Sequence, residues 1–200
     1  MVVGLTGGIA SGKSEVSAIL KSLGAQIVDA DHISRDVVKP GTSGNEALHL
    51  VFGDEIFSPD GSINRRTLGD IVFSDPTALE MLNQMLHPLI LDCISEQIKA
   101  HKSVNSDALI VLEAPLLIET GLHTSTDEVW VVTAPLSLRL QRLMERDHLS
   151  ESEAKKRIDT QTCDEYKLRH ATRVIHNIGS LEALHDQTMA FYQAIKEFHG

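Results

Sequence analysis

The stretch that most constrains the fold is "GLTGGIASGKS", residues 4–14. Gly7, Gly12, Lys13 and Ser14 match the pattern G-x-x-x-x-G-K-[ST], in which a glycine-rich turn points successive backbone N–H groups at an anion. A helix that begins at such a turn adds the positive end of its dipole. The pattern needs a strand before it and a helix after it. It therefore predicts a strand–loop–helix unit that binds phosphate groups.

Both flanks of this motif meet that requirement. A short apolar run, residues 2–5, precedes it and is typical of a buried strand. Downstream, apolar residues recur with the spacing of one helix face, and Gly24 stands where a helix C-cap belongs. The residues of this face are Val16, Ile19, Leu20 and Leu23. We expect Lys13 to reach the β- and γ-phosphates of a nucleotide and the Ser14 hydroxyl to bind Mg²⁺.

Further apolar segments predict the rest of a parallel sheet. Strands are expected at residues 25–30, 108–113, 128–134 and 173–177, and helical patterns lie between them. This alternation predicts an α/β fold with a five-stranded parallel sheet. The last segment, residues 180–198, reads as a helix. Its expected buried side consists of Leu181, Leu184, Met189, Tyr192 and Ile195.

One connection between the predicted strands is far too long for a single crossover helix. Residues 32–106 are expected to form a mostly helical insertion at the binding edge of the sheet. Within it, residues 76–86 carry one apolar helix face, and Pro88 is expected to start a second helix. The nucleotide-binding core would then consist of the remaining strands and helices. Its expected parts are residues 1–31, 107–135 and 171–200.

A second long connection, residues 136–170, is rich in arginine. Phosphoryl transfer places negative charge on the phosphate oxygens, and a mobile arginine-bearing segment can neutralise that charge and exclude water. We therefore expect a lid here, although the arginines could instead form a helix face paired with neighbouring acids. Ser150 and Glu153 form a capping box that opens a helix, from which Arg157 and Gln161 would project on one side.

Overall charge and composition narrow the class of protein. The 200 residues are 42% hydrophobic and carry a net charge of −10, which argues against a nucleic-acid partner. No apolar run approaches the length of a membrane span, and we expect neither a signal peptide nor a membrane partner. The two cysteines, Cys93 and Cys163, lack the spacing of a metal or disulfide framework, which favours a cytoplasmic location.

Acidic residues lie at the ends of two of the predicted strands. Asp29 and Asp31 are two apart, so at the end of a strand they would point to opposite sides, and one could face the ligand. A carboxylate there could accept the proton of a hydroxyl that attacks the γ-phosphate. The alternative is a pair of solvated loop acids. Glu113 ends the next strand, where it could support Mg²⁺ or simply be a strand-end charge in water.

These motifs, in this order, resemble the dephospho-CoA kinase family. The segments that carry the resemblance are "GLTGGIASGKS", "DADHISR", "GSINRRTLGDIVF", "LNQMLHPLI", "APLLIE", "RLMERD" and "VIHNIG". The resemblance covers residues 2 to about 180. The resemblance implies a P-loop NTPase-type three-layer core, a helical substrate-binding insertion and a helical lid. It also implies ATP-dependent phosphorylation of the ribose 3′-hydroxyl of dephospho-CoA, which gives coenzyme A and ADP.

The resemblance implies roles for individual residues. The catalytic residues would be Asp31 as the base, Lys13 and Arg142. ATP would contact Gly8, Ala10, Ser11, Gly12, Lys13, Ser14, Glu15, Arg142, Asn177 and Gly179. The acceptor would contact Thr6, Asp31, Arg35, Arg65, His87, Pro115 and Arg139. Mg²⁺ would be held by Ser14 and by ATP itself, and the protein would be a monomer or a weak oligomer.

The chain departs from the family pattern in the P-loop and at the end of one strand. Ala10 stands where the family commonly has glycine, and alanine is tolerable there only if its φ is negative. Glu15 stands where threonine is common, so its side chain must turn away from ATP or weaken ATP binding. An aspartate is commoner than Glu113.

Two other functions fit the P-loop. The first is a kinase for another small acceptor, such as a nucleotide or a shikimate-like compound, although the long insertion favours a large acceptor. The second is a GTPase-type switch, but the sequence contains no guanine-reading N-K-x-D motif.

Overall fold

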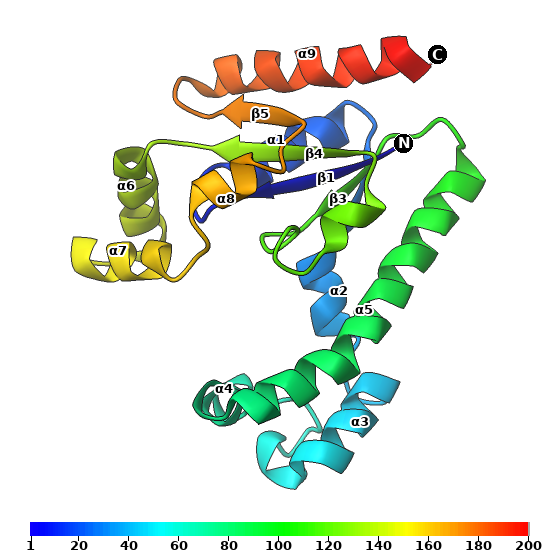
Figure 1. Cartoon of the computed structure of the whole chain (residues 1–200), viewed down its shortest axis with the longest axis vertical. Coiled ribbons are helices and arrows are strands. Elements are labelled where there is room, and N and C mark those ends of the chain that lie inside the picture. Colours follow the sequence, from blue (N-terminus) through cyan, green and yellow to red (C-terminus); the bar gives the residue numbers. More distant parts are fainter. Residues whose placement is uncertain (200) are drawn as a thin grey trace. The chain divides into compact units, whose positions relative to one another are not determined.

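Five short strands form one parallel sheet in the computed structural model, which describes residues 1–199 (Figure 1). The strands are β1 (Val2–Gly7), β2 (Gln26–Asp29), β3 (Ile110–Glu113), β4 (Glu128–Thr133) and β5 (Arg173–His176). Their order in the sheet is β2-β3-β1-β4-β5, which places β1 at the centre. Val3 of β1 lies opposite Val111 of β3 and Glu128 of β4. The predicted α/β class with a five-stranded parallel sheet is confirmed.

The central strand separates two layers of packing because its side chains alternate between the faces of the sheet. Val3 and Leu5 are fully buried in a core shared with α1 (Lys13–Ser22) and α9 (Leu181–His199). On the other face, Gly4 leaves room for Leu117, since a Cβ on Gly4 would lie 2.6 Å from the Leu117 Cδ2 atom. This alternation produces the three-layer arrangement expected of a P-loop core.

The described residues form two compact units, residues 29–100 and residues 1–28 with 101–199. Helices of the smaller unit are α2 (Ala30–Asp36), α3 (Ser43–Phe52), η1 (Asp54–Ile56), α4 (Arg65–Ser74) and most of α5 (Pro76–Val104). Besides α1 and α9, the larger unit contains η2 (Leu122–Ser125), α6 (Leu136–Asp147), α7 (Glu151–Asp159) and α8 (Asp164–Leu168). The predicted capping box of Ser150 and Glu153 is present at the start of α7.

The prediction that Pro88 starts a new helix is wrong. Residues 76–104 form a single helix that contains Pro88 (Figure 1). Proline lacks one backbone N–H and its ring crowds the preceding turn, so inside a helix it causes either a kink or a break. Ala78 and Ile94 are buried on either side of the proline, so packing holds both flanks in place.

The sequence pattern placed Asp31 at the end of a strand, and this prediction is wrong. The strand β2 stops at Asp29, whose carboxylate accepts the His32 backbone N–H at 3.0 Å and so caps α2. Aspartate is among the best N-cap residues, and it favours a helix that begins at once. Asp31 therefore lies in the first turn of α2, where the helix dipole favours a negative charge.

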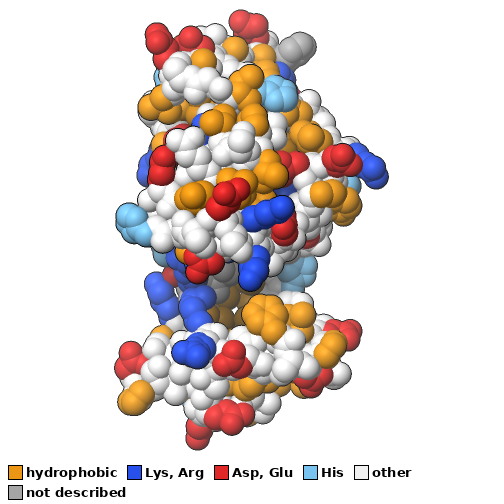
Figure 2. Space-filling model, turned by 90° about the vertical axis from the view of Figure 1, so that its left-hand side faces the viewer, with side chains coloured by type: hydrophobic (Ala, Val, Ile, Leu, Met, Phe, Trp, Pro, Cys, Tyr) orange, Lys and Arg blue, Asp and Glu red, His pale blue; other side chains and the backbone are white. Residues whose placement is uncertain are grey.

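The molecular surface carries mixed charge. The face that Figure 2 shows carries acidic, basic and hydrophobic side chains, and the hydrophobic ones form several groups. The expected buried side of α9 is wrong at one position, because Leu181 is 66% exposed, whereas Leu184 and Ile195 are buried.

Within residues 1–199, no helix is long and apolar enough to cross a membrane.

Candidate active site

A cavity of about 950 Å³ lies in the larger unit, around the loop that connects β1 to α1. Its walls include all ten residues predicted to contact ATP, and they also include Pro115. From the predicted set, the lining residues are Gly8, Ala10, Ser11, Gly12, Lys13, Ser14, Glu15, Pro115, Arg142, Asn177 and Gly179. Residues that are distant in sequence therefore meet around one loop.

The loop leaves the N-terminus of α1 open to an anion. Gly12 is the N-cap residue, and because glycine has no side chain it cannot accept a capping hydrogen bond from the first turn. The first N–H groups of a helix have no partner within the helix, so they are available to a ligand. Gly12 also has a φ of 97°, and a Cβ there would lie 2.0 Å from the Asn177 Nδ2 atom, so the position requires glycine.

The expectation of a negative φ at Ala10 is wrong, because its φ is +60°. A left-handed conformation costs an L-residue about 1–2 kcal/mol. An anion-binding turn needs left-handed residues to bring neighbouring N–H groups to one side, and here this requirement outweighs the preference of alanine. The Ala10 methyl group also packs against the small apolar cluster around Leu143, Ala154 and Ile158, which offsets part of the cost.

Lys13 is held beside the cavity by Glu113. Its ammonium group donates a hydrogen bond to the Glu113 carboxylate, and the two side chains are only 15% and 12% exposed. Glu113 is therefore not a strand-end charge in bulk water. The contact brings the end of β3 to the P-loop lysine.

Arg142 reaches the same cavity from α6. Its Nη2 atom donates to the Asn177 Oδ1 atom at 3.2 Å, and the Asn177 Nδ2 atom donates to the Ser11 carbonyl at 2.9 Å. The Arg142 Nη1 atom is buried, and it has no hydrogen-bond partner among the residues that the structure describes. One end of this guanidinium is thus fixed, whereas the other retains donors for a ligand.

Arg139 and Gln161 contact the P-loop directly. Arg139 is 5% exposed, and its Nε atom donates to the Ile9 carbonyl at 2.8 Å. Gln161 accepts the Ile9 backbone N–H at 2.6 Å. The prediction that Gln161 and Arg157 share a helix side is wrong, because α7 ends at Asp159. Acceptor binding by Arg139 stays a prediction, and its side chain is not part of the cavity wall.

A buried lysine supports the wall of the cavity at Pro115. Lys167 of α8 is 1% exposed, and its ammonium group donates to the Pro115 carbonyl at 2.8 Å and to the Glu119 carboxylate at 2.5 Å. The Thr6 hydroxyl donates to the same carbonyl at 3.1 Å. Burial raises the pKa of the Glu119 carboxyl, but hydrogen bonding led by Lys167 outweighs it and the net pKa is lowered. Sequence reasoning missed Lys167, since a lysine in a charged segment resembles a surface residue.

Glu15 does not turn away from the cavity. It is an exposed residue of the first turn of α1 and lines the cavity together with Arg146. The pKa of the Arg146 guanidinium is raised, chiefly by its hydrogen bond to Asp147 and further by the charge of Glu15. The carboxylate of Glu15 therefore lies at the cavity wall, close enough to Arg146 to affect the pKa of its guanidinium.

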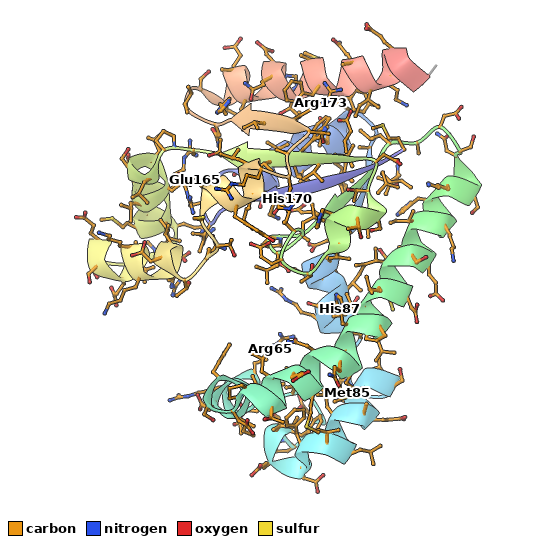
Figure 3. All side chains as sticks on the ribbon, viewed as in Figure 1. Arg65, Met85, His87, Glu165, His170 and Arg173 are labelled. Carbon is orange, nitrogen blue, oxygen red and sulfur yellow. The ribbon has the colours of Figure 1, made fainter. Side chains whose placement is uncertain are left out.

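The other predicted acceptor residues belong to the smaller unit. Arg35 lies in the last turn of α2. Arg65 begins α4, and His87 lies in α5 (Figure 3). The His87 Nε2 atom is buried and lacks a hydrogen-bond partner in the described part of the chain. Their contact with an acceptor stays a prediction, as does that of Asp31.

The chain resembles known proteins over nearly its whole length. The family model described as dephospho-CoA kinase matches residues 1–183. A dephospho-CoA kinase of Moorella thermoacetica is 45% identical over 195 residues, which cover 98% of this chain and 92% of the relative. The crystal structure of TT1252 from Thermus thermophilus has a TM-score of 0.83 at 34% identity and covers 97% of both chains. Dephospho-CoA kinase from Campylobacter jejuni has a TM-score of 0.65 at 30% identity, with coverage of 97% and 96%.

Proposed function

The chain belongs to the dephospho-CoA kinase family, which transfers a phosphoryl group from ATP to dephospho-CoA, and we propose that its P-loop cavity holds the ATP. This enzyme carries out the final step of coenzyme A biosynthesis. The observation that carries the proposal is the meeting, at one cavity, of the uncapped α1 N-terminus with Lys13 and Arg142. Each of the three supplies positive potential to a polyphosphate.

The two cations would act on different parts of the reaction. Lys13 would bind the β- and γ-phosphates, sharing its ammonium hydrogens between them and Glu113. Arg142 would use its unpaired Nη1 atom to stabilise charge on the transferred group. Segment 136–170, which carries Arg142, would then act as the lid.

The residues around Lys13 fit a magnesium ion delivered with ATP. Ser14 offers a hydroxyl at the cavity wall, and Glu113 offers a carboxylate beside Lys13. Mg²⁺ prefers oxygen ligands and usually combines one or two protein groups with phosphate oxygens and water. When bound, the ion would neutralise charge on the phosphates. Ser14 would be the protein ligand, and Glu113 would orient Lys13.

Asp31 would be the general base. β2 runs parallel to β1 in the same sheet, so the chain leaves both strands at the same edge, and Asp31 follows β2 by two residues. A ribose 3′-hydroxyl is too weak an acid to ionise near neutral pH, and a carboxylate can take its proton as the P–O bond forms. The insertion, with Arg35, Arg65 and His87, would bind the rest of dephospho-CoA.

The two cysteines bear on the compartment in which the protein works. Cys93 and Cys163 are both free thiols, which a reducing cytoplasm would maintain. We therefore propose that the reaction takes place in the cytoplasm. As a separate proposal, the protein would be a monomer or a weak oligomer.

The test is product formation from Mg-ATP and dephospho-CoA, with coenzyme A detected by mass spectrometry. The wild-type chain should form coenzyme A, and Lys13→Ala should nearly abolish turnover. Lys21→Ala, at an exposed position of the same helix, is the matched control and should retain full activity.

A second variant tests the base. Asp31→Asn should slow single-turnover transfer by roughly 10²-fold, the low end for loss of a general base, while ATP affinity stays unchanged. A loss of less than about threefold would mean that Asp31 only positions the ribose, since removing a base costs about 10² or more.

A further inference from the structure

Both backbone groups of one P-loop residue are occupied by side chains from the 136–170 segment. The Ile9 N–H donates to the Gln161 Oε1 atom at 2.6 Å, and the Ile9 carbonyl accepts from the Arg139 Nε atom at 2.8 Å. Gln161 follows α7, whereas Arg139 lies in α6. The segment proposed as a lid therefore holds the phosphate-binding loop itself at one residue.

Arg139 is fixed on both of its sides. Its Nη1 atom donates to the Asp164 carboxylate at 2.8 Å, and the two side chains are 6% and 31% exposed. Its guanidinium also packs on Gly8, where a Cβ would lie 2.5 Å from the Nη2 atom. Moving Arg139 to reach a ligand would leave Asp164 without its partner, so its observed contacts favour a supporting position.

The hydrogen bond from Arg139 to the Ile9 carbonyl determines the direction of the next backbone N–H group. The peptide unit is planar and trans, so the carbonyl of one residue and the N–H of the following residue point in opposite directions. Because Arg139 holds the Ile9 carbonyl, the Ala10 N–H points away from Arg139. Asn177 holds the Ser11 carbonyl at 2.9 Å and fixes the Gly12 N–H in the same way.

Ala10 needs this support because its φ of +60° is unfavourable for alanine. A residue in a strained conformation persists only when its neighbours hold it. Ile9 and Ser11, the residues on either side of Ala10, are both tethered by the side chains described above. Loss of one tether would let the loop relax and turn N–H groups away from the anion.

We propose that Gln161 is a positioning residue, which sets the affinity of the P-loop for a nucleoside triphosphate by holding the Ile9 amide. The inference rests on the proposed function of this loop as the site of the ATP phosphates. Gln161 is the residue to test because it is uncharged and half-buried, so its removal leaves one N–H unpaired. Removal of Arg139 would instead leave the Asp164 carboxylate unpaired and could prevent folding.

The experiment compares Gln161→Ala with Gln141→Ala. Gln141 is an exposed residue of α6 whose amide donates to Glu145 at 3.0 Å, and Gln141 is not among the residues that line the cavity, so the same atoms are removed without changing the contact to Ile9. Calorimetry with ATP, tripolyphosphate and adenosine separates the phosphate contribution from the nucleoside contribution. Amide exchange of Ile9, followed by NMR, reports the tether directly.

Gln161→Ala should weaken ATP and tripolyphosphate by a similar factor, about three- to tenfold, as loss of one hydrogen bond implies. The KM for ATP should rise while the KM for dephospho-CoA stays constant, and Ile9 exchange should become at least about tenfold faster. Adenosine binding should not change. Gln141→Ala should match the wild type in every measurement.

Three results would overturn the inference. Weaker ATP binding with unchanged tripolyphosphate binding would mean that Gln161 contacts the nucleoside. A lower melting temperature with unchanged affinities would mean that it only stabilises the fold, and unchanged Ile9 exchange would mean that the tether is absent. The binding comparison does not depend on turnover, so a failure to form coenzyme A would count against the proposed function alone.

Discussion

Replacement of the buried Lys167 tests how the wall of the active site is held. Lys167→Met keeps the volume of the side chain but removes its ammonium group, which leaves the Glu119 carboxylate without its cation. Breaking a buried ion pair by removing one partner costs about 3–5 kcal/mol. Glu119 retains 19% exposure, so water can replace part of the lost contact. We therefore expect a loss of about 3 kcal/mol in the free energy of unfolding.

The melting temperature should fall by about 6–12 °C, because a chain of this size loses about 2–4 °C for each kcal/mol. The assay is urea unfolding followed by circular dichroism, with midpoint and slope both fitted. Lys155→Met is the control, because Lys155 is exposed on α7 and its loss should change stability by less than about 0.5 kcal/mol.

The double variant Lys167→Met, Glu119→Leu decides whether the charge is responsible. With both charges gone, no ion is left buried without a partner, and the Thr6 hydroxyl still donates to the Pro115 carbonyl. Most of the lost stability should return, because replacing both members of a buried pair with apolar residues is often neutral. The reasoning would be refuted by a single-variant loss below about 1 kcal/mol or by additive losses in the double variant.

Three more predictions follow from individual side chains. Ala10→Gly should change the free energy of unfolding by less than about 1 kcal/mol, because relief of strain opposes the lost methyl contact. The control Ala154→Gly, inside α7, should cost about 1.5–2 kcal/mol. Equal losses of the two variants in urea unfolding would contradict the strain at Ala10. Glu119 has a lowered pKa, so its ionised form stabilises the fold above pH 4.5, and that contribution is lost as the pH falls through the folded-state pKa. Acid should therefore destabilise the wild type more than Glu119→Gln. Parallel profiles of stability against pH would exclude this role. Glu15→Thr should tighten ATP binding by about two- to fivefold in calorimetry, and no change would mean that its charge does not reach the phosphates.

Features that depend on neighbours in the chain were correctly predicted from sequence. The P-loop pattern, the five strands and the capping box at Ser150 all follow from spacing within a few residues, because backbone geometry and side-chain periodicity act over that range. Prediction was wrong where two local preferences competed. Asp29 could extend a strand or cap a helix, and it caps α2; Pro88 could begin a helix or bend one, and it lies within α5.

Tertiary structure decided which side chains support the P-loop. Gln161 is 152 residues from Ile9, Arg139 is 130 residues from it, and Lys167 is 48 residues from Glu119, so no spacing pattern joins these pairs. The sequence predicted the anion-binding loop through its glycines, Lys13 and Ser14, since those residues act through their own backbone and side chains. Burial of Arg139 and Lys167 depends instead on how α6 and α8 pack within the larger unit. A charged residue becomes a structural support only when packing removes it from water and supplies a partner, and both conditions arise from contacts between segments far apart in the chain.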